Sequence, residues 1–398
     1  MHATQLLDKP IGSQCQDIHR VRWKALMDIT TALIHEKKLT LTGLGRAINS
    51  TAFVKHNIKR ADRLIGNIHL KKDGLDIYRA MAHTIIGRMK QPVILVDWSD
   101  LSKDREFHFL RASIPVGGRA LTIYEESHRQ NRAGKPQVHN AFLRTLQSII
   151  PKHCCPIIVT DAGFRAPWFR AVKSLGWDYV GRVGGHTMIC PHGTGDWIRT
   201  EYIFDIATAR AKYLGHVDIV RNHPLPCHTY LLRKKKQGRI KKTVFGHRCE
   251  MKHSEKNAHR ERTPWLIATS LEGGAKITKR IINIYKTRMQ IEESFRDIKN
   301  SRWGFSLDEA RAYSTIRYDN LLLIGSLAIF CIWLLGKMAE LRNIHLRYQA
   351  NSIQHRKVIS TFFLGCQVLH KDLKSFRRRE QEQALSAIRE DVVVYSYV

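Results

Sequence analysis

Residues 285–299 read YKTRMQIEESFRDIK, and this stretch decides how the rest of the chain is interpreted. Its polar residues Tyr285, Arg288, Glu292 and Lys299 stand at offsets of 0, 3, 7 and 14. An α-helix turns about 100° per residue, so the four side chains fall within a stripe roughly 60° wide on one helix face. A solvated charged face fits this pattern, and so does a face that binds phosphate and metal.

The composition favours a polyanionic partner. The chain has 398 residues, of which 43% are hydrophobic, and 66 Lys+Arg against 35 Asp+Glu give a formal net charge of +31. The excess is spread along the whole chain, so it is not a basic tail. Such a field attracts phosphate backbones. A ribosomal or heparin-like binder would also be basic, but those proteins rarely need a core of this size.

The cysteines and the apolar segments indicate a reduced, cytoplasmic environment. The eight cysteines are scattered without a CxxC pair, which is typical of free thiols. The N-terminal residues show no apolar signal core. The most apolar run, residues 321–335, has fifteen residues and falls short of the ~20 that span a bilayer. We therefore expect this run to form a buried helix.

Residues 1–85 are predicted to form a helical DNA-binding domain. The pattern indicates a short helix capped by Thr42, a turn at Asn49 or Ser50, and a second helix that ends near Ile65. A short helix, a turn and a basic helix suggest a helix-turn-helix-like unit. A plain helical hairpin with a solvated basic face is the alternative. The expected DNA contacts on the second helix are Lys55, Lys59, Arg60 and Arg63, next to His56.

Residues 86–183 are predicted to form the first part of an α/β catalytic core. The continuous apolar run in PVILVDWSD indicates a strand buried on both faces that ends at Asp97, and CPIIVTDAGF indicates a second such strand that ends at Asp161. Together with the intervening patterns, residues 92–183 predict the order β-β-β-α-β-α-β. A mixed sheet flanked by helices, with acids at the ends of two strands, resembles the ribonuclease-H-like fold.

Residues 184–264 change in character and are interpreted as a β-rich insertion. Glycine, histidine, proline and basic residues dominate there, and strand-like pieces replace helices. The run RKKKQGRIKK at 233–242 is expected to be a solvated loop or a hairpin that contacts DNA. Cysteine and histidine residues in the insertion could bind zinc, but their spacing matches no closed four-ligand pattern.

Residues 265–338 are predicted to return to the core and to carry its second part. A strand begins at residue 265, residues 276–299 are expected to form one long helix, and residues 313–338 a pair of buried helices. Residues 339–398 are predicted to be a basic, mostly helical C-terminal region.

Three carboxylates, Asp97, Asp161 and Glu292, are the candidate catalytic and metal-binding residues. Mg²⁺ prefers oxygen ligands and keeps waters and substrate phosphate in its shell. Two such ions about 3.5–4 Å apart can activate a water or a 3′-hydroxyl on one side of a phosphodiester and stabilise the leaving oxygen on the other. Asp100 lies past the expected strand end and Glu293 points about 100° away from the stripe, so neither is chosen.

These residues match a known family. The chain resembles the bacterial DDE transposases of the family-four insertion sequences, whose signature is Y-x2-R-x3-E-x6-K. Tyr285, Arg288, Glu292 and Lys299 reproduce that spacing, and the motifs VDWSD and TDAGF resemble the family's two acidic strand motifs. The order of parts is also similar: a helical N-terminal domain, a core, a β-rich insertion and a helical C-terminus. The resemblance runs from about Leu39 to about Cys366.

The resemblance implies cut-and-paste transposition by a bacterial enzyme. Water would nick each transposon end, the freed 3′-hydroxyl would attack the opposite strand to form a DNA hairpin, a second water would open it, and the 3′-hydroxyl would join target DNA. The cofactor would be two Mg²⁺ ions, with Mn²⁺ as a substitute. The partners would be the terminal inverted repeats and target DNA, bound by a homodimer.

The resemblance also assigns DNA contacts. Tyr285, Arg288 and Lys299 would hold the phosphate and the terminal nucleotide, in agreement with the bidentate grip of arginine and the point charge of lysine. Trp265 would stack on a base flipped out at the hairpin. A core aromatic is the alternative for Trp265.

Two other functions use the same residues. A ribonuclease-H-like nuclease or junction resolvase would employ the same acids, but it would not need the insertion or an end-binding unit. A catalytically silent DNA-binding repressor would need no acidic triad.

Overall fold

The computed structural model describes residues 4–102, 104–234, 263–302, 304–371 and 376–396. The chain divides into two compact units, each described by itself. The first joins the chain up to Pro156 to the chain from Thr287 onward, and the second is Ile157–Lys286. The chain therefore leaves the first unit after Pro156, forms the second unit, and returns to the first unit at Thr287.

The N-terminal part of the first unit is helical, as predicted. The short helix and the basic helix expected from the sequence are both present, but the cap differs. The side chain of Thr40, not Thr42, accepts a hydrogen bond from the Gly43 amide at 3.2 Å, because the helix already begins at Leu41. The helices are α1 (Gln5–Asp8), α2 (Arg20–Glu36), α3 (Leu41–Ala47), α4 (Val54–Ile65) and α5 (Ile68–Ile86).

Three antiparallel strands follow: β1 (Val93–Asp100), β2 (Phe107–Val116) and β3 (Arg119–Arg129). Gly117 and Gly118 make the β2–β3 turn, with φ of +52° and +86°, which is the region that a two-residue hairpin turn requires. The prediction that β1 ends at Asp97 is wrong, because the strand stays paired with β2 through Asp100. Helix α6 (Pro136–Ile149) packs on β3.

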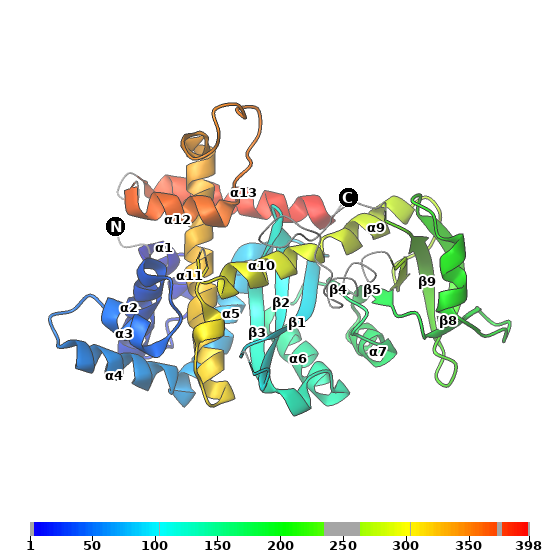
Figure 1. Ribbon diagram of the computed structural model, residues 1–398, viewed down its shortest axis with the longest axis horizontal. Helices are drawn as coiled ribbons and strands as arrows, with labels where there is room; N and C mark the ends of the chain where they lie inside the picture. The colour runs from blue at the N-terminus through cyan, green and yellow to red at the C-terminus, as the bar shows by residue number, and fades with distance from the viewer. Residues whose placement is uncertain (1–3, 103, 235–262, 303, 372–375, 397–398) are drawn as a thin grey trace, which may run out of the picture. The chain divides into compact units, whose positions relative to one another are not determined.

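The most apolar run lies within one helix, α11 (Thr315–Leu341), instead of the predicted pair. Gly336 does not break it. A Cβ there would lie 2.0 Å from the carbonyl oxygen of Thr361, so the glycine serves close packing against α12 (Thr361–Lys371). Among the described residues α11 is the one helix long and apolar enough to cross a membrane, but its most apolar window is 94% buried inside the fold. The predicted burial is confirmed. Figure 1 shows α11 between the N-terminal helices α1–α4 and the strands β1–β3 of the first unit.

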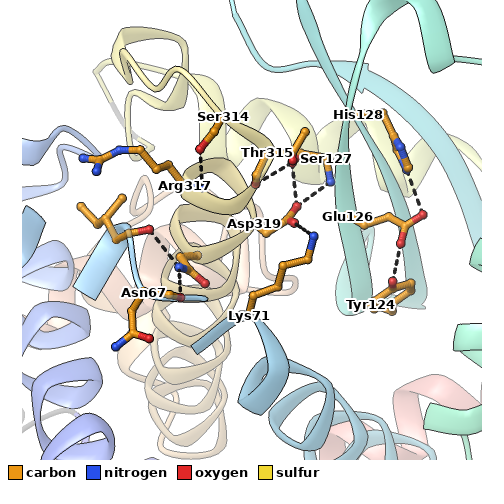
Figure 2. Close-up of polar contacts among 12 residues, drawn as sticks. Asn67, Lys71, Tyr124, Glu126, Ser127, His128, Ser314, Thr315, Arg317 and Asp319 are labelled. Atoms are coloured by element: carbon orange, nitrogen blue, oxygen red, sulfur yellow. Dashed lines mark hydrogen bonds and ion pairs between the residues drawn. The ribbon is translucent and has the colours of Figure 1, made fainter. Parts of the chain in front are cut away.

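Polar side chains tie α11 to its neighbours (Figure 2). The Asp319 carboxylate accepts hydrogen bonds from the amide and hydroxyl of Ser127 on β3, at 2.7 and 2.6 Å, and pairs with Lys71 of α5 at 2.9 Å. The amide of Asn320 donates to the carbonyl of Ile65 at 2.9 Å, at the C-terminal end of α4. One turn of α11 therefore holds the N-terminal helices and the hairpin strands in one body.

The predicted long helix at 276–299 is two helices, α9 (Thr278–Lys286) and α10 (Met289–Lys299). The amides of Gln290 and Ile291 bond to the carbonyls of Thr287 and Arg288, three residues back, at 2.8 and 3.2 Å. This tighter turn interrupts the 3.6-residue repeat. Helix α9 belongs to the second unit and α10 to the first. Helix α13 (Arg378–Ser396) completes the predicted helical C-terminal region.

The second unit holds a mixed sheet. Strands β4 (Ile157–Thr160) and β5 (Asp178–Val183) are parallel, and β10 (Trp265–Thr269) pairs antiparallel with β5 on one side and with β9 (Leu225–Leu232) on the other. The sheet continues through β8 (Lys212–Ile219), β6 (Met188–Pro191) and β7 (Ile198–Arg199). Helix α7 (Ala166–Ser174) packs on β5.

The predicted fold class is confirmed, since mixed strands flanked by helices form an α/β core of the ribonuclease-H-like kind. The described part of the insertion, 184–234, is β-rich as expected. Residues 235–242 of the basic run lie outside the described residues, as do the cysteine and histidines of 247–253.

A buried ion pair joins β2 and β3. Arg111 of β2 and Glu125 of β3 are partners across the ladder, their side chains have no solvent exposure, and the two groups approach to 2.7 Å. The guanidinium lies between the rings of Phe109 and Phe295, 5.0 and 5.1 Å from the centroids. Ser326 of α11 donates to the Glu125 carboxylate. Burial raises the pKa of the Glu125 carboxyl, and Arg111 opposes that shift.

Replacing Glu125 by Ala should destabilise the chain by about 3–5 kcal/mol, because an unpaired guanidinium would remain buried. The double variant Arg111→Met, Glu125→Leu removes both charges and should recover most of that loss. Urea unfolding of the three proteins measures the difference. Equal destabilisation by the single and double variants would contradict a role for the unpaired charge.

Candidate active site

Two carboxylates of the first unit meet at one guanidinium. Arg288, the residue before α10, places one nitrogen 3.3 Å from Asp97 Oδ2 and the other 2.7 Å from Glu292 Oε1. The Asp97 and Arg288 side chains are 13% and 14% exposed and Glu292 is 43% exposed, so the cluster opens to solvent on the Glu292 side. The structure thus brings three predicted residues together from a strand and a helix turn that are 191 residues apart in sequence.

Helix α10 is fixed on the hairpin by contacts on its buried face. The hydroxyl of Ser294 accepts from the amide of Ala120 and donates to its carbonyl oxygen, both at 2.8 Å. Asp297 accepts from Arg119 at 2.8 Å, and Phe295 packs edge-on against Phe109. Ser294, Phe295 and Asp297 follow Glu292 within one and a half turns, so their contacts fix the rotation of the helix that carries Glu292.

The neighbouring acids have other partners. Asp100 pairs with His108 at 3.0 Å and Arg105 at 3.4 Å. Glu293 pairs with Arg296 of its own helix at 2.6 Å and approaches Arg119 at 3.7 Å. The choice of Asp97 and Glu292 over these two acids stays a prediction.

Lys299 ends α10 as a half-buried ammonium 6.0 Å from the Phe109 ring centroid. Burial lowers the pKa of Lys299, while Asp308 and Asp100 act in the opposite direction. A partly desolvated cation gains more from an anionic ligand than a fully hydrated one does. This environment is suited to a phosphate contact.

The residues that hold β1 next to Asp97 could not be predicted from the sequence. The indole of Trp98 donates to His139 Nε2 of α6 at 3.1 Å, and the His128 ring lies edge-on to it at 5.5 Å. Burial lowers the pKa of His139 to about 4, which keeps the acceptor nitrogen unprotonated near neutral pH. Trp98 and His139 are 41 positions apart in sequence, and no pattern in the intervening segment links them.

The other predicted core residues lie in the second unit. Asp161 directly follows β4 as expected, and its Oδ1 accepts from the Gly163 amide at 2.8 Å in a tight turn. Trp265 is the first residue of β10 and meets Tyr285 of α9 edge-on, with ring centroids 4.8 Å apart. Lys234 places its ammonium 4.0 Å from the Trp265 ring centroid. A base that stacks on that face would have to displace Lys234.

A basic groove also lies in the second unit, between the β8–β9 hairpin and α9. Its volume is about 810 Å³. The described residues of its lining include no acid and seven cationic side chains: Arg210, Lys212, Arg233, Lys234, Lys276, Lys279 and Lys286. Such a lining is suited to a phosphate backbone.

The predicted contacts on α4 divide into two kinds. Lys55, Lys59 and Arg63 are exposed. Arg60 forms an ion pair with Asp28 of α2, and both side chains are about one-third exposed. In this structure Arg60 therefore holds α4 against α2.

Asp97 and Glu292 fit a hard divalent cation, because their oxygens already converge on one positive group and carboxylate oxygens are the ligands that Mg²⁺ prefers. Within the described ranges no three His, Cys, Asp or Glu side chains are grouped closely enough to hold an ion. The contribution of Asp161 to the same site stays a prediction.

Replacing Arg288 by Gln should leave two carboxylates facing each other without a cation. We expect the Tm without divalent ions to fall by about 1–2 °C, since the groups are partly exposed. Millimolar Mg²⁺ or Mn²⁺ should raise the Tm of the variant more than that of the wild type. Arg296→Gln, on the same helix, is the matched control and should show neither effect. Identical metal responses in Arg288→Gln and wild type would count against the ionic bridge.

Comparison with known proteins identifies the family of the chain. The sequence profile of the transposase DDE domain family matches residues 88–330, more than half of the chain. Comparison with curated proteins gives no match. The matched segment contains Asp97, Asp161 and Glu292, and the family acts on DNA with divalent metal ions. The chain belongs to the DDE transposases.

Proposed function

We propose that this transposase moves a bacterial insertion sequence of the family-four type by cut and paste. The observation that supports it most directly is the Arg288 guanidinium held between Asp97 and Glu292, a cation within reach of two carboxylates at an opening to solvent. Water nicks the transposon end, the 3′-hydroxyl attacks the opposite strand to close a hairpin, a second water opens it, and the 3′-hydroxyl joins target DNA.

Asp97, Asp161 and Glu292 would hold two Mg²⁺ ions, or Mn²⁺ in their place. When bound, the ions lower the pKa of the attacking water or hydroxyl and stabilise the leaving oxygen. Arg288 is the natural phosphate ligand of the site, because its fork already spans both acids and can rotate to grip a phosphodiester in two places. Lys299 and Tyr285 would hold the same phosphate and the terminal nucleotide.

The DNA partners are the terminal inverted repeats and the target duplex, handled by a homodimer in the bacterial cytoplasm. Helices α3 and α4 would recognise the repeats, and the basic groove of the second unit would follow a backbone. Trp265 would stack on a flipped base once Lys234 moves off its ring.

The deciding assay incubates the full chain and Mg²⁺ with a linear duplex that ends in the element's inverted repeat. Hairpin products and their later opening support the proposal. Nicking without hairpins or strand transfer indicates the nuclease or resolvase, and a shifted band without cleavage in Mg²⁺ or Mn²⁺ indicates the repressor.

Glu292→Gln should abolish cleavage and leave end binding nearly intact, because it removes a metal ligand and no phosphate contact. Glu293→Gln is the matched control, since it changes the adjacent acid whose partners are Arg296 and Arg119. The control should cut within a few-fold of wild type. Cleavage rates and gel shifts on the same duplex measure both. A parallel loss of binding in Glu292→Gln would show that its carboxylate is structural.

Arg60→Ala should weaken end binding. If Arg60 acts by holding α4 on α2, Asp28→Asn weakens binding to a similar extent, and neither variant changes the salt dependence of the binding constant. A direct phosphate contact predicts instead that Arg60→Ala alone reduces the slope of log K against log salt by about 1. Titration of both variants at several salt concentrations separates the two roles.

A further inference from the structure

Two large apolar side chains are exposed at the N-terminal end of α4. Phe53 is 75% exposed and Val54 51% exposed. They are adjacent in sequence and stand at the first turn of the helix, where the chain leaves the turn after α3. An exposed apolar pair at the tip of a basic helix indicates a surface that is covered in a complex.

The surrounding frame is rigid. A Cβ on Gly45 of α3 would lie 2.5 Å from the Cα of Ile58, so the two helices cross as closely as their backbones allow. Asn57 is buried, accepts from the Ser50 hydroxyl at 2.8 Å and donates to the carbonyl of Ala52 at 3.5 Å. Hydrogen bonds of the buried Asn57 therefore fix the turn that precedes Phe53 and Val54.

The charges around the pair favour nucleic acid. Lys55, Lys59 and Arg63 are exposed along α4, and the Lys55 ammonium is 5.9 Å from the Phe53 ring centroid. Asp62, the one acid in the α4 sequence, pairs with Arg317 at 2.6 Å. A protein partner with an apolar surface would have no need for three cations beside it.

We infer that Phe53 and Val54 read thymine methyl groups in the major groove of the transposon-end DNA. The C5-methyl of thymine is the one apolar group that base pairs present there, and the N-terminal residues of the second helix of a helix-turn-helix unit contact base edges. Lys55, Lys59 and Arg63 contact the flanking phosphates. This inference rests on the proposed recognition of the inverted repeats.

The test compares two duplexes of the terminal inverted repeat, one with thymine and one with deoxyuridine at every thymine position. Fluorescence anisotropy with the full chain at fixed salt gives both affinities. Wild type should bind the thymine duplex tighter by about fourfold for each methyl group that leaves water. Phe53→Ala should lose most of this preference, and Phe53→Leu should keep part of it.

Two controls separate methyl reading from other effects. Val21→Ala removes an exposed apolar side chain elsewhere, 69% exposed on α2, and should leave both affinities unchanged. Lys59→Ala should weaken binding to both duplexes equally. It should also reduce the slope of log K against log salt by about 1. Thermal melts confirm that each variant folds.

Equal wild-type affinity for the two duplexes would overturn the inference, and so would full discrimination by a folded Phe53→Ala variant. These outcomes concern binding alone, so a chain that makes no hairpins but discriminates thymine from uracil refutes the cut-and-paste proposal and supports this one. A chain without preference for the inverted repeat over unrelated DNA counts against both.

Discussion

The site depends on a guanidinium that keeps two carboxylates together. Asp97 and Glu292 arrive on a strand and a helix that share no sequence neighbourhood, and in the absence of a cation their charges would push the two elements apart. Arg288 satisfies both from the turn between α9 and α10. The same turn interrupts the helix between α9 and α10. Arg288, which bridges the two acids, therefore lies outside both helices instead of on one continuous helix face. A phosphate and metal ions could take over its two partners without a change in the backbone.

Next to this site the first unit contains a second ion pair that solvent cannot reach. Arg111 and Glu125 are buried together between aromatic rings, and Arg111 lies opposite Asp97 across the ladder. A buried ion pair stabilises a fold little more than well-packed apolar residues do. Removal of only one partner, however, destabilises the fold by several kcal/mol. Its place on β2 and β3, next to Asp97 across the ladder, favours a role in fixing the register of those two strands over a role in overall stability.

Helix α11 unites the parts of the first unit that are proposed to contact DNA. Asp319 and Asn320 are successive residues, and they hold α5 and β3 on one side and the end of α4 on the other. The basic helix and the strand that carries Asp97 are therefore anchored to the same turn. A DNA end recognised by α4 would meet a fixed geometry at Asp97, Arg288 and Glu292.

The sequence by itself determined the α/β class, the strand and helix order from residue 92 to 183, the helical N-terminus and the candidate acids, because these follow from local periodicity and from a motif of fixed spacing. The predictions from sequence were wrong where contacts with residues distant in the chain decide the bounds of a helix or strand. Residues 313–338 were predicted as two helices but lie in one, α11, in which Gly336 packs closely against Thr361. Strand β1 continues past Asp97 because β2 remains paired with it. Only the tertiary structure gave Arg60 a partner in Asp28, placed His139 behind Trp98 and exposed Phe53, since each depends on which surfaces lie against one another. The motif of residues 285–299 predicted the four polar side chains. The turn at Arg288 places Tyr285 on α9 and leaves Glu292 and Lys299 on α10.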